Sequence, residues 1–300
     1  MRLDQCLAEI FPDYSRSKLQ TWIKAGRVKV NGLARQGRDR LDGGEALELD
    51  AEAEAVLICD AEEIPLHIVH EDDSLLIVNK PAGLVVHPAV GNWSGTLVNA
   101  LLNHEPKLNI LPRAGIVHRL DKDTSGLLMV AKTLQAHNSL VEQLQERSIE
   151  REYLALVKGW MTAGGCVDEP IGRHPVDRKR YAVRRDGKEA VTHYRLEKRF
   201  KRHTLIRVML ETGRTHQIRV HMSHINYALV GDPVYGGRFQ MPAECSPALA
   251  EAFRNFKRQA LHAAKLGLEH PETGEYCEWE QEMPADMRHL IELLAENELA

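Results

Sequence analysis

One short polar stretch separates two apolar segments of this 300-residue chain: Gly115-Ile116-Val117-His118-Arg119-Leu120-Asp121-Lys122-Asp123-Thr124-Ser125-Gly126. Its last four residues are an ordinary turn sequence that would start a buried strand at Leu127. A turn leaves His118, Arg119 and Asp121 unexplained. These three side chains are therefore candidates for a functional site.

The stretch is superficially similar to the catalytic loop of protein kinases. In that loop His, Arg and Asp are contiguous and an Asn lies five residues after the Asp, whereas here Leu120 intervenes and position 126 is glycine. A glycine-rich phosphate loop and a P-loop motif are also missing. The sequence therefore argues against a kinase.

A second polar segment, from Leu210 to His221, contains a Thr-Gly turn followed by Arg214. His216, His221 and His224 are residue types that bind metals, but their spacing does not place all three on one face of a helix, so we predict no metal site. Contacts to RNA or to a carboxylate are the better expectation. Arg214 could pair with a catalytic Asp and keep it ionised, or be a solvated loop arginine.

Around these segments, apolar patterns typical of strands and helices follow one another irregularly. We expect strands at 75–78, 127–131, 153–157, 191–199 and 203–211, and helices at 134–145, 216–225 and 285–296. Because strands and helices do not alternate one to one, the pattern favours an α+β fold with a mixed, mainly antiparallel sheet over a doubly wound parallel sheet.

The first fifty residues have a pattern of their own. Apolar residues recur at helical spacing over 3–12 and again from Leu19 to Ile23, and a short strand at 28–30 meets the tight-turn pair Asn31-Gly32. Residues 45–63 then carry eight acidic side chains and no Lys or Arg. We therefore predict a small α+β domain at 1–50, an acidic linker at 51–63 and a large domain at 64–300.

Composition places the chain among ordinary globular proteins, with 43% hydrophobic and 27% charged residues. The five cysteines are scattered and form no Cys-x-x-Cys pair, so neither a disulfide framework nor a zinc site is predicted. No apolar run approaches the length of a membrane span, and the first residues do not resemble a signal peptide. We expect a cytoplasmic protein without a membrane partner.

The formal net charge of -4 conceals a strong segregation along the chain. Residues 1–42 carry a net charge of +4 and residues 173–221 a net charge of +10, so the rest of the chain carries -18. Such local density of Lys and Arg suits a nucleic acid held through its phosphates. Charge alone leaves a second interpretation open, in which acidic neighbours balance two solvated surfaces after folding.

Taken together, these motifs resemble the pseudouridine synthases of the large-subunit ribosomal RNA family, which have a His-Arg-Leu-Asp signature and an N-terminal domain like that of ribosomal protein S4. The resemblance spans nearly the whole chain. It rests on residues 15–18, 28–32, 79–88, 118–126, 151–153, 212–221, 231–236 and 258–263. Arg151 stands where many family members have lysine.

The resemblance implies an enzyme that breaks the N1–C1′ bond of a uridine within RNA, turns the uracil and rejoins it through C5, without a cofactor. Asp121 would act on C1′, much as a glycosidase carboxylate does. Tyr153 would lie against the uracil and could take the C5 proton, or it could be an ordinary core tyrosine. Arg214 would hold Asp121 in place and keep it ionised.

The same resemblance implies that the target uridine leaves its stack. Arg119 would fill the vacated space, or make a phosphate contact instead. We expect further RNA contacts from His118, His216 and Arg219. A basic cluster of the small domain is expected to bind the RNA backbone, with dimerisation or folding as the alternative role, and it consists of Arg16, Lys18, Lys24, Arg27 and Lys29.

The expected partner is large-subunit ribosomal RNA, as a stem-loop or within an assembling subunit, with no obligate protein partner. A non-catalytic assembly factor with the same fold would have no chemical need to keep Asp121, Tyr153 and Arg214. A hydrolytic N-glycosidase or a nuclease would need a second carboxylate or a metal to activate water, and the sequence shows neither cluster. The uridine-isomerising enzyme is therefore the leading prediction.

Overall fold

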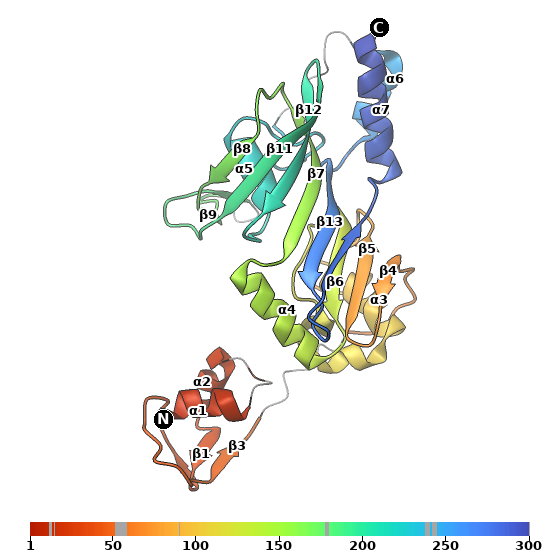
Figure 1. Cartoon of the computed structure of the whole chain (residues 1–300). Coiled ribbons are helices and arrows are strands. Elements are labelled where there is room, and N and C mark those ends of the chain that lie inside the picture. The colour runs from red at the N-terminus through yellow and green to blue at the C-terminus, as the bar shows by residue number, and fades with distance from the viewer. Residues whose placement is uncertain are drawn as a thin grey trace.

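The computed structural model describes residues 1–11, 14, 16–51, 59–89, 91–177, 180–237, 241 and 245–299. Figure 1 shows a small N-terminal unit and a large unit built on a long sheet. The small unit contains two helices, α1 (Leu3–Ile10) and α2 (Arg16–Lys24). Its three-stranded antiparallel sheet consists of β1 (Val28–Val30), β2 (Leu33–Ala34) and β3 (Leu47–Leu49).

The small unit folds around its own apolar core. Asn31 and Gly32 have φ angles of 50° and 76°, which the tight turn between β1 and β2 requires. The helices, the first strand and the turn expected in this region are confirmed. The core residues are Leu3, Leu7, Leu19, Trp22, Ile23, Val28 and Val30.

The predicted acidic linker covers 51–63, of which 52–58 lie outside the described residues. Its last part contacts the large unit. The Glu62 N–H donates to the carbonyl of Asn99 at 3.0 Å, and the Glu62 carboxylate accepts the Gly95 N–H at 2.9 Å. Cys59 packs against the main core. We propose that the boundary between the two domains lies before residue 59.

The large unit is built on one nine-stranded sheet, in the order β4-β5-β6-β13-β7-β12-β11-β8, with β14 paired to β13 (Figure 1). Neighbouring strands are antiparallel except β6 and β13, which run parallel. The prediction of a mixed, mainly antiparallel α+β fold is confirmed. The strands are β4 (Ile68–Glu71), β5 (Leu75–Lys80), β6 (Ser125–Ala131), β7 (Glu150–Lys158), β8 (Gly165–Asp168), β11 (Val191–Phe200), β12 (His203–Leu210), β13 (Leu261–Glu269) and β14 (Tyr276–Glu280).

Helices cover both faces of this sheet. Because side chains alternate along a strand, Leu76 and Val78 of β5 enter one core, while Leu75 and Ile77 enter another on the opposite face. The first core includes α3 (Leu97–His104) and α5 (Gln217–His224), and the opposite face packs against α4 (Leu134–Glu146), α6 (Pro247–Asn255) and α7 (Ala285–Leu299).

The remaining elements are short. Two 3-10 turns, η1 (Pro106–Ile110) and η2 (Pro112–Gly115), lead into the polar stretch. A separate antiparallel hairpin consists of β9 (Ile171–Arg173) and β10 (Tyr181–Val183).

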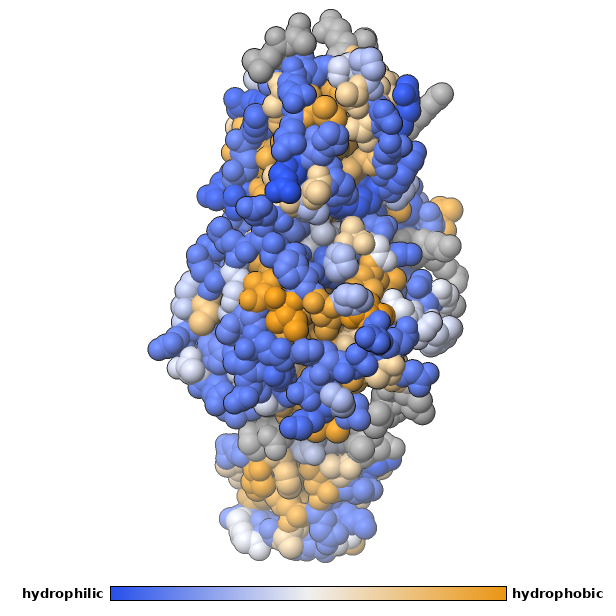
Figure 2. Space-filling view, turned by 90° about the vertical axis from the view of Figure 1, so that its right-hand side faces the viewer, coloured by the Kyte–Doolittle hydropathy of each residue, from blue (hydrophilic) through white to orange (hydrophobic). Residues whose placement is uncertain are grey.

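The face shown in Figure 2 is mostly hydrophilic, with apolar side chains gathered near its middle and over the small unit at the bottom of the view. Among the described residues, no helix combines the length and the apolar character needed to cross a membrane.

Glycine is required at both ends of the polar stretch. Gly115 and Gly126 have φ angles of +78° and +114°, and a Cβ atom at either position would collide with a backbone carbonyl, that of Ala131 or of Ala263. Gly126 thereby allows β6 to lie directly beside β13. The loop between the two glycines is fixed at both ends.

Candidate active site

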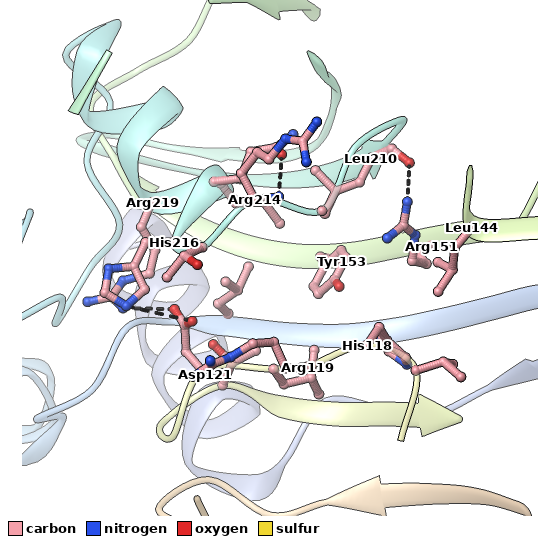
Figure 3. Close-up of a pocket in the computed structure, with 18 of the residues that line it drawn as sticks. His118, Arg119, Asp121, Leu144, Arg151, Tyr153, Leu210, Arg214, His216 and Arg219 are labelled. Atoms are coloured by element: carbon pink, nitrogen blue, oxygen red, sulfur yellow. Dashed lines mark hydrogen bonds and ion pairs between the residues drawn. The ribbon is translucent and has the colours of Figure 1, made fainter. Parts of the chain in front are cut away.

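Both polar segments predicted from the sequence line one pocket of about 640 Å³ (Figure 3). The first segment contributes His118, Arg119 and Asp121, and the turn before α5 contributes Arg214. Tyr153 reaches the pocket from β7. The structure therefore brings together segments that are about a hundred residues apart, as the sequence analysis expected.

Lys80 anchors the loop that carries Asp121. Its Nζ donates to the carbonyls of Pro81, Leu84 and Lys122 at 2.7, 3.0 and 3.0 Å. Burial lowers the pKa of Lys80 to about 7, against the opposing effect of two nearby carboxylates. Lys80 thus ties the end of β5 to the residue that follows Asp121.

Residues far along the chain hold the other end of this loop. Arg258 Nη1 donates to the carbonyl of Asp123 at 3.3 Å, and Gln259 Nε2 donates to Thr124 Oγ1 at 3.0 Å. The sequence alone predicted no role for the 258–263 segment. The structure shows that it positions the loop.

The Asp121 carboxylate forms an ion pair at the pocket wall (Figure 3). Its Oδ2 accepts from Arg219 Nη1 at 2.8 Å. The same guanidinium makes a two-pronged contact with Asp232, from Nε to Oδ2 at 2.7 Å and from Nη2 to Oδ1 at 3.0 Å. Burial alone would raise the pKa of Asp232, but the bonds from Arg219 more than offset this and lower it. Asp232 therefore fixes the Arg219 guanidinium in the position from which it bonds to Asp121.

The prediction that Arg214 pairs with Asp121 is wrong, because Arg219 occupies that place. Gln217 Oε1 accepts the Arg214 N–H at 2.9 Å, which keeps Arg214 on the turn before α5. The exposed Arg214 side chain donates through Nε to the carbonyl of Glu189 at 2.8 Å. Arg219 lies within α5, on the helix face turned toward the Asp121 loop.

Two of the predicted RNA contacts, Arg219 and His118, have other partners. The Arg219 side chain is 5% exposed and forms ion pairs with Asp121 and Asp232. His118 Nε2 accepts the Met129 N–H at 3.1 Å, which joins the loop to β6. Burial lowers the pKa of His118 to about 3, so its ring is neutral at pH 7. Both side chains therefore position other groups of the protein, and their contacts to RNA stay predictions.

Tyr153 and His216 face the pocket from two sides. Tyr153 is 7% exposed, and burial raises the pKa of its phenol. His216 has a left-handed backbone (φ 58°), and its Nδ1 lies 2.8 Å from the Tyr235 hydroxyl. Its Nε2 is 3.8 Å from Asp121 Oδ1. His216 therefore belongs to the surroundings of the carboxylate, where sequence reasoning placed it only among RNA contacts.

Arg119 is one of three exposed arginines that line the pocket, with Arg113 and Arg214. No hydrogen bond or ion pair of its guanidinium is found within the described part of the chain. An exposed guanidinium two residues before Asp121 is available to a bound RNA.

The basic cluster of the small unit surrounds a buried carboxylate. Asp4 is 1% exposed and accepts from Arg2, Arg16 and Gln20. Lys24 and Lys29 are exposed and Arg27 is half-buried, while the Lys18 side chain lies outside the described residues. A second pocket lies here, and it adds three cations that the sequence analysis did not single out, namely Arg2, Arg35 and Arg38.

Sequence reasoning also missed a group of possible metal ligands, His70, Asp72 and His270, none of which lines the pocket. Both imidazole Nε2 atoms contact Asp72 Oδ2, at 2.7 and 3.0 Å. The Nδ1 atom of His270 accepts the N–H groups of Glu272 and Thr273. The proton of a neutral His270 ring is therefore on Nε2, where a metal would need a lone pair. The geometry favours a hydrogen-bonded link between two hairpins over a metal site.

Comparison with known proteins adds two family matches. The model for RNA pseudouridylate synthases matches residues 74–224, and the S4 domain model matches residues 1–47. Ribosomal large subunit pseudouridine synthase D of Pseudomonas aeruginosa is 56% identical over 296 residues, covering 99% of this chain and 92% of that protein. The protein of the same name from Escherichia coli K12 is 55% identical over 294 residues, covering 98% and 90%.

Among solved structures, human RNA Pseudouridylate Synthase Domain Containing 1 is similar, with a TM-score of 0.57 and 25% identity. The match covers 75% of this chain and 86% of that one. Human RNA Pseudouridylate Synthase Domain Containing 4 has the same fold, with a TM-score of 0.57, 24% identity and coverage of 76% and 93%.

Proposed function

Because this chain belongs to the RNA pseudouridylate synthase family, we propose that it isomerises uridines of large-subunit ribosomal RNA to pseudouridine. The substrate is inferred from relatives that are named for the large ribosomal subunit and match almost the whole chain. The observation that carries the chemistry is the Asp121 carboxylate, held at the pocket wall by Arg219.

The ion-pair cluster suits chemistry at a sugar carbon. As ionised side chains, Asp121, Arg219 and Asp232 sum to one negative charge. Asp232 matters because Arg219 alone would neutralise Asp121. When the N1–C1′ bond breaks, C1′ becomes electron-deficient, and a carboxylate beside it stabilises that carbon electrostatically or by forming a bond to it.

Tyr153 is proposed to lie flat against the uracil. A buried phenol with a raised pKa rarely exists as the phenolate at neutral pH, so the environment of Tyr153 favours contact with the base over proton abstraction from C5. An aromatic face beside the ring holds the uracil in the pocket while it is detached and turned.

RNA binding is proposed to involve both units. Arg119 is proposed to occupy the gap that the extruded uridine leaves in its stack. The exposed cations of the small unit, with Lys24 and Lys29 among them, are proposed to contact phosphates. The expected location is the cytoplasm, where the substrate is either a ribosomal RNA stem-loop or an assembling subunit.

Pseudouridine mapping tests the proposal directly. Purified protein is incubated with deproteinised large-subunit RNA and, separately, with large-subunit precursor particles. We expect pseudouridine at defined positions in at least one of them, and none with Asp121→Asn, which keeps the shape of the side chain but removes its charge. Wild-type protein that binds both substrates and modifies neither would instead indicate a non-catalytic assembly factor.

A further inference from the structure

Arg151 is a buried cation that the mechanism above does not use. The residue is 7% exposed, and its Nε atom has no hydrogen-bond partner. Its Nη2 makes only long contacts, of 3.4 Å, to the carbonyls of Leu210 and Glu211. None of the ion pairs found among the described residues includes Arg151. Burying a guanidinium without a counter-charge is unfavourable, so such a residue points to a functional demand.

The position of Arg151 relates it to the reacting base. Arg151 and Tyr153 are two residues apart on β7 and therefore face the same side, and both line the pocket. In Figure 3, Asp121 lies toward one end of the pocket and Arg151 toward the other, with Tyr153 between them. Gly213 leaves room at this end, since a Cβ atom there would lie 3.0 Å from Arg151 Nη1.

We propose that the Arg151 guanidinium binds the O4 carbonyl oxygen of the target uracil and stabilises the negative charge that this ring carries while it is detached from the ribose. The inference rests on the proposed function. With C1′ at Asp121 and the ring against Tyr153, the carbonyl-bearing edge of the uracil extends toward Arg151.

The reaction creates the charge that Arg151 is placed to meet. When the N1–C1′ bond breaks, its electron pair stays with the uracil, which then carries one negative charge shared by N1, C5 and both carbonyl oxygens. C5 forms the new bond to C1′, the proton on C5 passes to solvent water, and N1 takes up a proton from solvent water, so that no atom is gained or lost. A guanidinium already in place stabilises the ring through the charged stage.

His118 does not supply this charge, because its ring is neutral at pH 7.

The donor geometry also gives specificity for uracil. Cytosine has an amino group where uracil has the O4 carbonyl, and an arginine has no acceptor for an amino group. An RNA phosphate is the other negatively charged group that Arg151 could bind. The experiment distinguishes binding to a phosphate from binding to the detached uracil.

The test compares Arg151→Met and Arg151→Lys with wild type, and uses Arg288→Met as the matched control. Arg288 lies on α7 and pairs with Glu282, outside the pocket. Single-turnover pseudouridine formation, RNA affinity at several salt concentrations and thermal unfolding are measured for each protein. A uridine-containing RNA is compared with one carrying 4-thiouridine, whose sulfur is a weaker hydrogen-bond acceptor.

We expect Arg151→Met to form pseudouridine about 10²–10³-fold more slowly, the range seen when one preorganised donor is removed. RNA affinity and its salt slope should stay within twofold of wild type. The melting temperature should stay or rise, because methionine replaces an uncompensated buried charge. Arg151→Lys should fall between the two, and 4-thiouridine should slow wild type more than Arg151→Met.

Other results overturn the inference. A rate within threefold of wild type would remove Arg151 from the reaction. Weaker binding with a salt slope reduced by about one would assign it to a phosphate. A lowered melting temperature with a matching loss of rate would make its role structural. Wild-type protein that forms no pseudouridine would overturn the proposed function itself. If wild type and Arg151→Met are both active, only the inference about Arg151 is overturned.

Discussion

Replacing Arg219 by methionine should damage both stability and catalysis, whereas the same change at Arg214 should damage neither strongly. Arg219 makes three bonds of 2.7–3.0 Å to two carboxylates, and the Asp232 side chain is completely buried. Removing one partner of a buried ion pair costs about 3–5 kcal/mol, because the other charge stays buried. For a unit of this size we expect the melting temperature to fall by roughly 10 °C.

The rate should fall for a separate reason. Asp121 loses its 2.8 Å bond to Arg219 and with it a fixed orientation, and a misplacement of about 1 Å costs roughly 10²-fold in rate. Arg214→Met removes an exposed side chain that bonds to a backbone carbonyl, so its unfolding free energy should change by about 0.5 kcal/mol or less. Urea unfolding and single-turnover pseudouridine formation measure the two effects.

The double variant Arg219→Met/Asp232→Asn separates stability from catalysis. It removes the buried cation and the buried anion together, so it should be more stable than Arg219→Met alone while remaining equally slow. An Arg219→Met protein as stable as Arg214→Met would refute the argument. So would a larger rate loss at Arg214 than at Arg219.

Three further predictions concern RNA and pH. Arg119→Ala should slow a structured stem-loop by roughly tenfold to a thousandfold in single-turnover assays but a short unstructured RNA much less, since only the former has a stack to leave; equal deficits would exclude a base-replacing role. Lys24→Ala/Lys29→Ala should weaken RNA binding and reduce the slope of log K against log salt by about 0.7–0.9 for each phosphate that the variant no longer binds, and an unchanged slope would favour a dimerisation or folding role for the small unit. Stability should fall as pH drops from about 6.5 toward 3, because burial holds the pKa of His118 at about 3 and of His203 at about 4 while the unfolded chain takes up these protons near pH 6.5. Urea unfolding between pH 4 and 7 should show the loss becoming shallower in His203→Gln but not in the exposed control His224→Gln, and equal slopes would contradict the argument.

The sequence was most informative where a local pattern decides the outcome. The expected strand at 191–199 is found at Val191–Phe200, and the expected helix at 134–145 is found at Leu134–Glu146. β13 was missed because its alanine and glycine residues are weak strand formers. Its pairing with β6 on one side and β7 on the other makes it a strand, and that pairing is a property of the whole fold.

The same contrast between local pattern and whole fold applies to the candidate site. The motifs identified Asp121 and the segments around it, because a turn could not explain those residues. Which arginine meets the carboxylate depends on where α5 begins, and the Gln217 bond to the Arg214 N–H sets that start. A shift of a few residues along a helix changes the face on which a side chain lies. Asp232, the partner of Arg219, lies in the 231–236 segment, for which the sequence predicted no role.

The bonds from Arg258 and Gln259 to the Asp121 loop have a consequence for biosynthesis. These bonds join residues 135 positions apart in the chain. When β6 of a growing polypeptide has left the ribosome, Arg258 and Gln259 have not yet been released, because they lie much later in the chain. The bonds that hold the Asp121 loop therefore cannot form at that stage. An incomplete chain therefore has an unassembled carboxylate site, so it should not modify the RNA of the particle translating it.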